Sequence, residues 1–272
     1  MPEARFNFPK GFLWGTASSA YQFEGNNKNT QWYEWEQQPG KIAEGHTCGL
    51  AADWLGGRWR EDFDRAEEGN HSAMRISIEW SRIQPAPDRW DEDALDLYID
   101  MLRALDRRSL FPIVNFHHFT DPLWVAEMGG WENEEVPALF AAYVERVTEA
   151  IHSAVTTYLT INEPNVPAVL GYLTGEYPPG KQDLDAAITV MTNYARGHAQ
   201  AYHKIKSIQP EARVGFAHAY RGFAPRSKAN PLDRLLAGIH HQLWNEFFPQ
   251  MFTEGKAHLL NRKISLPEAA GT

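Results

Sequence analysis

The chain has 272 residues, of which 43% are hydrophobic and 22% are charged, and these proportions are typical of a globular protein rather than a disordered one. Lys and Arg total 26 against 35 Asp and Glu, so the formal net charge is −9. An acidic chain without a basic run is a poor partner for nucleic acid or for an anionic membrane surface, and we expect neither.

The single cysteine, Cys48, excludes an internal disulfide and favours a reducing, cytoplasmic location. Residues 1–10 are too polar for a signal peptide. No apolar run approaches the roughly 18 residues of a membrane span. Aromatic residues make up 12% of the chain and include ten Trp. Aromatic rings suit the apolar faces of sugar rings, although composition alone does not identify a ligand.

Five short runs rich in β-branched or aromatic residues predict strands, in chain order at residues 12–17, 73–78, 111–117, 155–161 and 213–219. Apolar stripes with helical spacing separate them. The stripes lie near residues 59–63 and at 95–105, 140–151, 188–205 and 235–247, and Asp91 is the expected cap of the second helix. Repeated β-then-α order predicts an α/β fold with a parallel sheet, formed by a single domain over residues 1–272.

No strand pattern is evident after the last predicted helix, and residues 266–272 read as a loop. Five strands are too few to close a (β/α)8 barrel. The chain is therefore expected to form an open sheet.

The strongest cluster of chemical groups is residues 160–165 (TINEPN), where the fourth strand ends. The carboxyl ends of parallel strands carry the chemistry in such folds, so Glu163 is well placed as a general acid. A helix-capping or surface glutamate is the alternative, and an isolated Asn-Glu-Pro favours that alternative.

Other strand ends supply polar side chains. His117 and His118 end the third strand, and strand alternation sends them to opposite faces, so one at most would face a site. Arg75 and Glu79 lie on or after the second strand, and Gln22 follows the first. HExxH, CxxC, GxGxxG, GxxxxGK and GxSxG motifs do not occur, so we expect neither a metal nor another cofactor.

Four segments taken together resemble the family 1 glycoside hydrolases, which are β-glucosidases and β-galactosidases. They are residues 12–25 (FLWGTASSAYQFEG), 74–83 (MRISIEWSRI), 115–124 (NFHHFTDPLW) and 160–164 (TINEP). They occur in order and at matching strand ends, and the resemblance covers essentially the whole chain. It implies a retaining β-glycosidase acting on a small β-glycoside or oligosaccharide. The preferred sugar stays open.

The resemblance also implies roles for individual residues. Glu163 is the implied catalytic acid/base, and Asn162 would bind the sugar 2-hydroxyl. Gln22 and His118 would bind other hydroxyls of the nonreducing sugar. Arg75 would neighbour the nucleophile and help to keep it ionised. Phe119, next to His118, stands where many family members have Trp.

One departure is serious, because the family nucleophile is a Glu in a Thr-Glu-Asn-Gly context and no such motif occurs here. Residues 253–255 (TEG) do not match it. We therefore expect an incomplete TIM (β/α)8 barrel of about the first five βα units, inactive in isolation. Glu79 is the first candidate if another carboxylate substitutes. The alternatives are a non-catalytic sugar-binding half-barrel or a nonfunctional fragment, and the expected partners include a complementing C-terminal fragment or a second copy of the chain.

Overall fold

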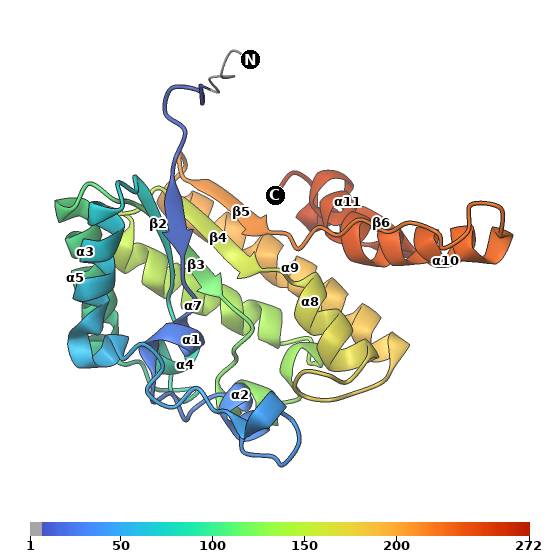
Figure 1. Cartoon of the computed structure of the whole chain (residues 1–272), viewed down its shortest axis with the longest axis horizontal. Coiled ribbons are helices and arrows are strands. Elements are labelled where there is room, and N and C mark those ends of the chain that lie inside the picture. Colours follow the sequence, from blue (N-terminus) through green and yellow to red (C-terminus); the bar gives the residue numbers. More distant parts are fainter. Residues whose placement is uncertain (1–6) are drawn as a thin grey trace, which may run out of the picture.

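The computed structural model describes residues 7–272. Residues 1–6, which belong to the stretch considered above as a signal peptide, lie outside the described residues. Five parallel strands form one sheet in the order β1-β2-β3-β4-β5 (Figure 1), which confirms the predicted α/β class. Their bounds are β1 Gly15–Ala17, β2 Ala73–Ser77, β3 Phe111–His117, β4 Thr157–Asn162 and β5 Arg213–Ala217.

The first strand is shorter than predicted. It pairs only with β2, because it lies at one edge of the sheet. The preceding Phe12 and Trp14 are 46% and 52% exposed. Their rings pack against each other and against Phe8, with centroids 4.6–5.0 Å apart. The apolar run therefore continues beyond the strand as an aromatic cluster rather than as sheet.

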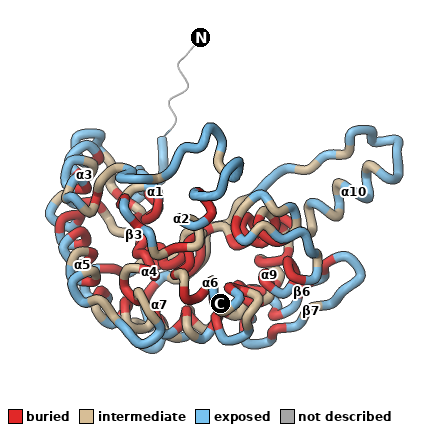
Figure 2. Tube along the Cα trace, turned by 90° about the horizontal axis from the view of Figure 1, so that it is seen from below, coloured by how far each residue is buried: buried red, intermediate tan, exposed pale blue. Residues whose placement is uncertain are grey.

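Long helices follow the strands and build the core, namely α3 Trp59–Glu68, α5 Glu92–Arg107, α7 Val136–Ile151 and α9 Leu184–Ile208. The side chain of Asp91 caps α5 as predicted, by accepting a 2.9 Å hydrogen bond from the backbone N–H of Ala94. Figure 2 shows the buried residues gathered inside the helical layer. Burial of these stripes positions the strands whose carboxyl ends form the candidate site.

Short elements occupy most of the loops. The short α-helices are α1 Ala20–Glu24, α2 Gln31–Glu36, α4 Trp80–Ile83, α6 Leu123–Glu127 and α8 Asn165–Pro167. Short 3-10 turns lie at Ala43–Gly45, Gly130–Glu132 and Pro267–Ala269, and π turns lie at Trp54–Arg58, Ala168–Leu173 and Gln242–Glu246. The short α-helices all come after the carboxyl end of a strand, so these loops bring several chain segments to one edge of the sheet.

The region after β5 differs from the prediction. The single helix expected over 235–247 is divided by a π turn into α10 Pro231–His241 and α11 Phe247–Glu254. The prediction of no further strand is wrong, because β6 Lys256–Leu259 and β7 Arg262–Ser265 form an antiparallel hairpin. Only two residues of β6, Ala257 and Leu259, are buried. This alternation is too short to predict a strand from the sequence.

Across residues 7–272, no helix has both the length and the apolar character needed to cross a membrane.

Candidate functional site

Three predicted site residues from neighbouring strands lie in a chain of contacts. Arg75 projects from β2, His118 follows β3, and Asn162 ends β4. The Nη1 of Arg75 donates to Oδ1 of Asn162 at 2.9 Å, and Nδ2 of Asn162 lies 3.2 Å from Nε2 of His118. Parallel pairing of β2, β3 and β4 places all three at the same edge of the sheet.

These contacts determine the hydrogen positions on the histidine. Burial, followed by the charges of Arg75 and His117, lowers the pKa of His118 to about 3. The imidazole is therefore neutral near pH 7. Because Arg75 occupies the amide oxygen of Asn162, the amide N–H₂ donates to Nε2, and the ring proton sits on Nδ1. That proton faces Oγ of Ser77, 3.4 Å away.

The paired histidines take opposite sides of the sheet edge, as strand alternation predicts. His117 is buried in the core, where its Nε2 lies 2.9 Å from Oδ1 of Asp121. His118 is half-buried and lines a cavity. The side chain available to a ligand is therefore that of His118.

Glu163 follows β4 with a backbone φ of +49°. This region is uncommon for a residue other than glycine, and such strain concentrates at functional sites. Its N–H donates to the carbonyl of Ala217 at 2.8 Å, and its carbonyl accepts from the N–H of Val166 at 2.8 Å. Burial lowers the pKa of Arg75, and the negative charge of Glu163 opposes that shift. The two side chains are therefore in electrostatic reach of each other.

Gln22 and His118 share a cavity of about 340 Å³, whose wall includes Trp32, Phe119 and Tyr177. The Oγ of Ser19 donates to Oε1 of Gln22 at 2.6 Å, which orients the amide. The residues that line this cavity do not include Arg75, Asn162 or Glu163. His118 therefore belongs to two groups of predicted residues. It contacts Asn162 at the strand ends, near Arg75 and Glu163, and it lines the cavity with Gln22.

Sequence reasoning singled out Phe119 but missed Trp32 and Tyr177, which complete an aromatic wall with it. The Trp32 and Tyr177 rings meet edge to face, with centroids 4.9 Å apart. Phe119 has a φ of +70°, and its carbonyl accepts hydrogen bonds from Nε1 of Trp32 and Nε2 of Gln31 at 3.0 and 2.9 Å. Trp32 belongs to an aromatic-rich segment (residues 31–36), which was an available signal. Tyr177 had no local signal.

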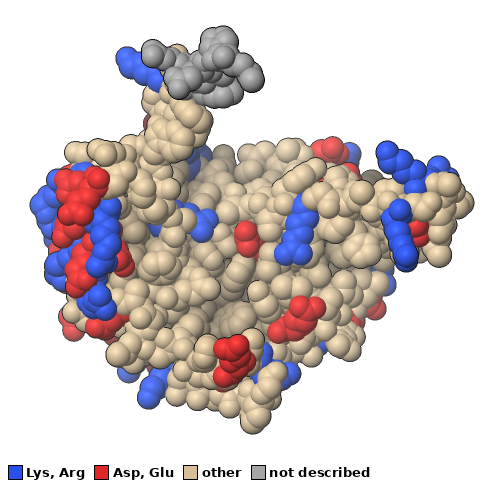
Figure 3. Space-filling model, viewed as in Figure 1, with Lys and Arg blue, Asp and Glu red and all other residues tan. Residues whose placement is uncertain are grey.

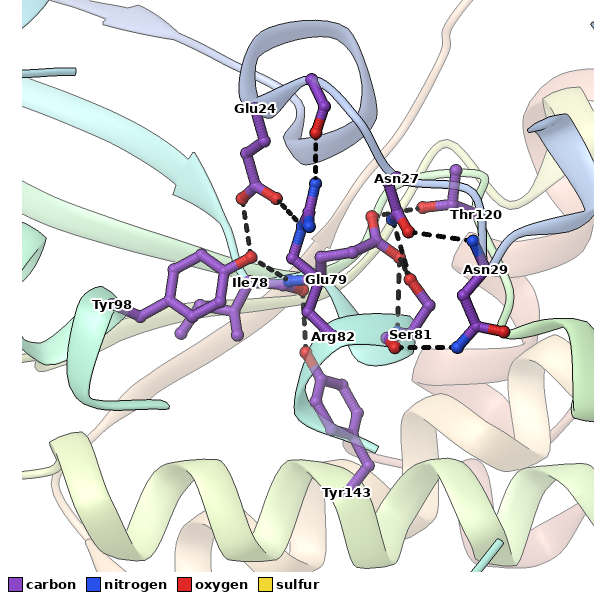
Figure 4. A network of polar contacts seen from close by, with 11 residues as sticks. Glu24, Asn27, Asn29, Ile78, Glu79, Ser81, Arg82, Tyr98, Thr120 and Tyr143 are labelled. Atoms are coloured by element: carbon purple, nitrogen blue, oxygen red, sulfur yellow. Dashed lines mark hydrogen bonds and ion pairs between the residues drawn. The ribbon is translucent and has the colours of Figure 1, made fainter. Parts of the chain in front are cut away.

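Glu79 is not available as a substitute nucleophile, because it lies in a buried polar network (Figure 4). Its carboxylate accepts hydrogen bonds from the hydroxyls of Thr120 and Ser81, at 2.8 and 2.9 Å. The residue is 2% exposed, and burial is the largest cause of its raised pKa. Its strand-end position suggested access to substrate, and only its packing shows the opposite.

The same network continues through Glu24, Arg82 and Tyr98 (Figure 4). Nε of Arg82 and the hydroxyl of Tyr98 each donate to the Glu24 carboxylate at 2.6 Å. The hydroxyl of Tyr98 also accepts from the N–H of Glu79 at 3.1 Å. Glu24 is two residues after Gln22, and Thr120 is two residues after His118. The network therefore fixes both segments that carry the cavity residues.

Charge is unevenly distributed around this site. Lys, Arg, Asp and Glu side chains gather over α3 and α5, whereas the middle of the molecular face seen in this view carries few (Figure 3). Among residues 7–272, no group of three or more His, Cys, Asp or Glu side chains is placed to hold a metal ion. The described site offers hydrogen-bonding groups and aromatic rings to a ligand.

The chain is similar in sequence and in structure to known β-glucosidases and β-glycosidases. Beta-glucosidase A of Thermotoga maritima is 31% identical over 239 residues, covering 86% of this chain and 53% of the relative. A β-glycosidase structure from Pyrococcus horikoshii matches with a TM-score of 0.85 and 32% identity, covering 96% of this chain and 59% of that one. A T. maritima β-glucosidase solved with castanospermine matches with a TM-score of 0.87 and 30% identity, covering 92% and 58%.

The chain thus spans about half the length of the curated relatives it matches, and its five βα units are those of a partial TIM barrel. The family model for glycosyl hydrolase family 1 matches residues 4–264. Because that match covers nearly the whole sequence, the chain belongs to glycosyl hydrolase family 1.

Proposed function

We propose that this chain provides the acid/base half of a retaining β-glycosidase that hydrolyses a small β-glycoside or oligosaccharide. In such enzymes two carboxyl groups, about 5–5.5 Å apart, divide the reaction. Glu163 protonates the leaving oxygen and then activates the water that releases the sugar. The nucleophile that forms the glycosyl-enzyme has no Thr-Glu-Asn-Gly counterpart in the 272 residues. The chain alone is therefore inactive.

The other predicted residues would position the sugar. Asn162 binds the 2-hydroxyl, and Gln22 and His118 bind hydroxyls farther round the ring. Arg75 holds positive charge beside the place where an anionic nucleophile would lie. The observation that carries this proposal is the Arg75–Asn162–His118 contact chain, since it orients an amide and a neutral imidazole at the same strand ends as Glu163.

Sugar recognition can be tested separately from turnover. A T. maritima relative was solved with castanospermine, so calorimetric titration of the full chain with that compound provides the readout. We expect binding that His118→Ala weakens about tenfold or more, consistent with loss of a half-buried hydrogen-bonding group. The matched control is His152→Ala, an exposed histidine at the end of α7. Equal binding by both variants contradicts the assignment.

Turnover provides the second test. We expect no hydrolysis of an aryl β-glucoside above a Glu163→Gln control. Addition of the C-terminal half of a family relative, containing its nucleophile, should restore hydrolysis that depends on Glu163. Association of the two pieces without activity would favour the alternative, a sugar-binding half-barrel. Activity of the chain alone that Glu163→Gln abolishes would show that another carboxylate acts as nucleophile.

We also propose that residues 1–272 form one domain. A single cooperative unfolding transition would support this proposal, and two separated transitions would contradict it.

The proposed location is cytoplasmic, based on the single cysteine of the sequence.

A further inference from the structure

A second cavity, of about 390 Å³, shares the aromatic wall of Trp32, Phe119 and Tyr177 with the cavity described above. It contains none of the five predicted site residues. Besides Phe119 of the shared wall, its lining comes from α2, from the segments 126–132 and 172–181, and from Gln38, Asp121, Pro167 and Tyr194. Its volume lies within the range typical of small-molecule sites.

Large aromatic surfaces line this second cavity. Trp35 is 4% exposed, Tyr172 6% and Tyr194 2%, and all three line it in addition to the aromatic wall. The Trp35 ring is closely packed. Gly180 lies so near it that a Cβ atom at that position would be 2.9 Å from the ring, and the Lys41 ammonium lies 4.0 Å from the ring centroid. Fixed aromatic faces of this kind pack against flat, partly apolar ligands.

The cavity also presents neutral hydrogen-bond donors. They are the hydroxyls of Tyr172 and Tyr194, two residues of the lining. Burial, and then the charge of Asp121, raises the pKa of the Tyr172 and Tyr194 hydroxyls, so both keep their protons near neutral pH. A protonated phenol hydroxyl can donate a hydrogen bond to a ligand oxygen.

Two of the three acidic side chains that line the cavity, in contrast, already have partners. Oδ1 of Asp121 accepts from His117 and from Nε1 of Trp131 at 2.9 Å each, and Oδ2 lies 3.3 Å from Nε2 of Gln31. Glu132 is paired with Lys181. The third, Glu34, is exposed. The buried part of the cavity therefore does not present an uncommitted anionic cage, which is what an organic cation would require.

We propose that this second cavity binds a neutral, hydroxyl-rich ring, such as one hexopyranose unit. The aromatic faces would contact its C–H groups. The two tyrosine hydroxyls would donate to its oxygens, and the remaining accepting capacity of Asp121 would bind a ring hydroxyl. This site is separate from the proposed catalytic half-site, because it uses other residues on the other side of the shared aromatic wall.

Calorimetric titration with methyl β-D-glucopyranoside tests the proposal in a His118→Ala background, where the first cavity is impaired. We expect binding to persist in that background. Ala126→Phe, which fills the second cavity from α6, should weaken it more than tenfold, whereas Glu127→Phe on the same helix should not, because Glu127 is exposed and outside the lining. Tyr172→Phe should weaken it about tenfold through loss of one donor.

A labelling experiment covers the case in which Ala126→Phe fails to fold. In a Cys48→Ser background, Ala126→Cys introduces one thiol into the cavity. We expect the same glucoside to slow its reaction with a maleimide at least threefold. Unchanged labelling, or glucoside binding that disappears with His118→Ala alone, overturns the proposal. Protection by tetramethylammonium but not by the glucoside also overturns it, because the ligand would then be a cation.

Discussion

Two amphipathic helices, α7 and α10, have the same kind of apolar periodicity but differ in how far their side chains are buried. Nine residues of α7 are buried, including Phe140 and Val147. In α10 no residue is buried, and Leu232, Leu235 and Leu236 are 45–59% exposed. Figures 1 and 2 both show α10 extending from the body, whereas α7 lies in the helical layer that covers the sheet. Periodicity predicts a helix, but burial depends on a neighbouring surface.

The strands repeat this contrast. The central β3 is paired on both sides and its last four residues are buried, whereas all three residues of β1 are exposed. The other edge strand, β5, has no buried residue. Unpaired edges of this kind invite association with another chain. Both edge strands of the sheet therefore lack the burial of the central strand, as α10 lacks the burial of α7.

The largest expected effect separates the two helices directly. Phe140→Ala removes a fully buried ring from α7, and we expect it to lower the free energy of unfolding by about 3–5 kcal/mol. Leu235→Ala on α10 should change it by less than about 0.5 kcal/mol, because that side chain is already solvated. Urea denaturation measures both. Equal losses would mean that α10 is packed in solution and would remove the contrast.

A smaller effect is expected within the buried network. Tyr98→Phe removes the hydroxyl that joins Glu24 to the N–H of Glu79. Leaving these buried groups without a partner should cost about 1–3 kcal/mol. Thermal unfolding provides the measurement, with the 69% exposed Tyr220→Phe as the control. If Tyr98→Phe matches its control, the network does not stabilise this region.

The network also gives stability a dependence on pH. Burial raises the pKa of Glu24 from 4.5 to about 7, despite the opposing charge of Arg82 and the hydrogen bond from Tyr98, and the charge of Glu79 adds to the rise. A raised pKa in the folded chain means tighter proton binding there. The stability this provides is present below pH 4.5 and is lost as pH rises through about 7.

We therefore expect Glu24→Gln to remove a slope of at most about 1.4 kcal/mol per pH unit across that window. Denaturation series at several pH values would measure it, with the exposed Glu68→Gln as the reference. A wild-type slope retained in Glu24→Gln would assign the proton to another group, and Glu79 is the first to examine because its pKa is also raised.

The smallest effect on stability is expected for a triple change on α10, Leu232→Gln with Leu235→Gln and Leu236→Gln. We predict that the unaltered chain self-associates or binds a hydrophobic dye, because contiguous exposed apolar surface favours both. The triple variant should reduce either signal while leaving the unfolding free energy almost unchanged. Light scattering that shows a compact, dye-free monomer before mutation would contradict the prediction.

Much of the fold was predictable because its signals are local. Five apolar runs located the five strands of the sheet to within a few residues, and the Asp91 cap located the start of α5. The hairpin after α11 was missed because β6 has only four residues, and two buried positions are too few to show an alternating pattern. The π turn that divides α10 from α11 had no local sign either, since the apolar stripe runs through it.

The candidate site also has features that the local sequence predicts and features that depend on distant segments. Strand alternation already separated His117 from His118, because side-chain direction along a strand is a local property. The burial of Glu79 and the meeting of Trp32 with Tyr177 were not predictable, since each depends on segments far apart in the chain.

The family, the order of βα units and the residue types at the strand ends follow from local motifs and periodicity, which any stretch of the chain carries on its own. The folded molecule is needed to learn which polar groups are committed to the interior, which aromatic rings form walls and which apolar faces stay exposed. Burial and hydrogen-bond satisfaction require two surfaces to meet, and those surfaces come from segments far apart in the chain. The same leucine stripe is core on one helix and solvated on another.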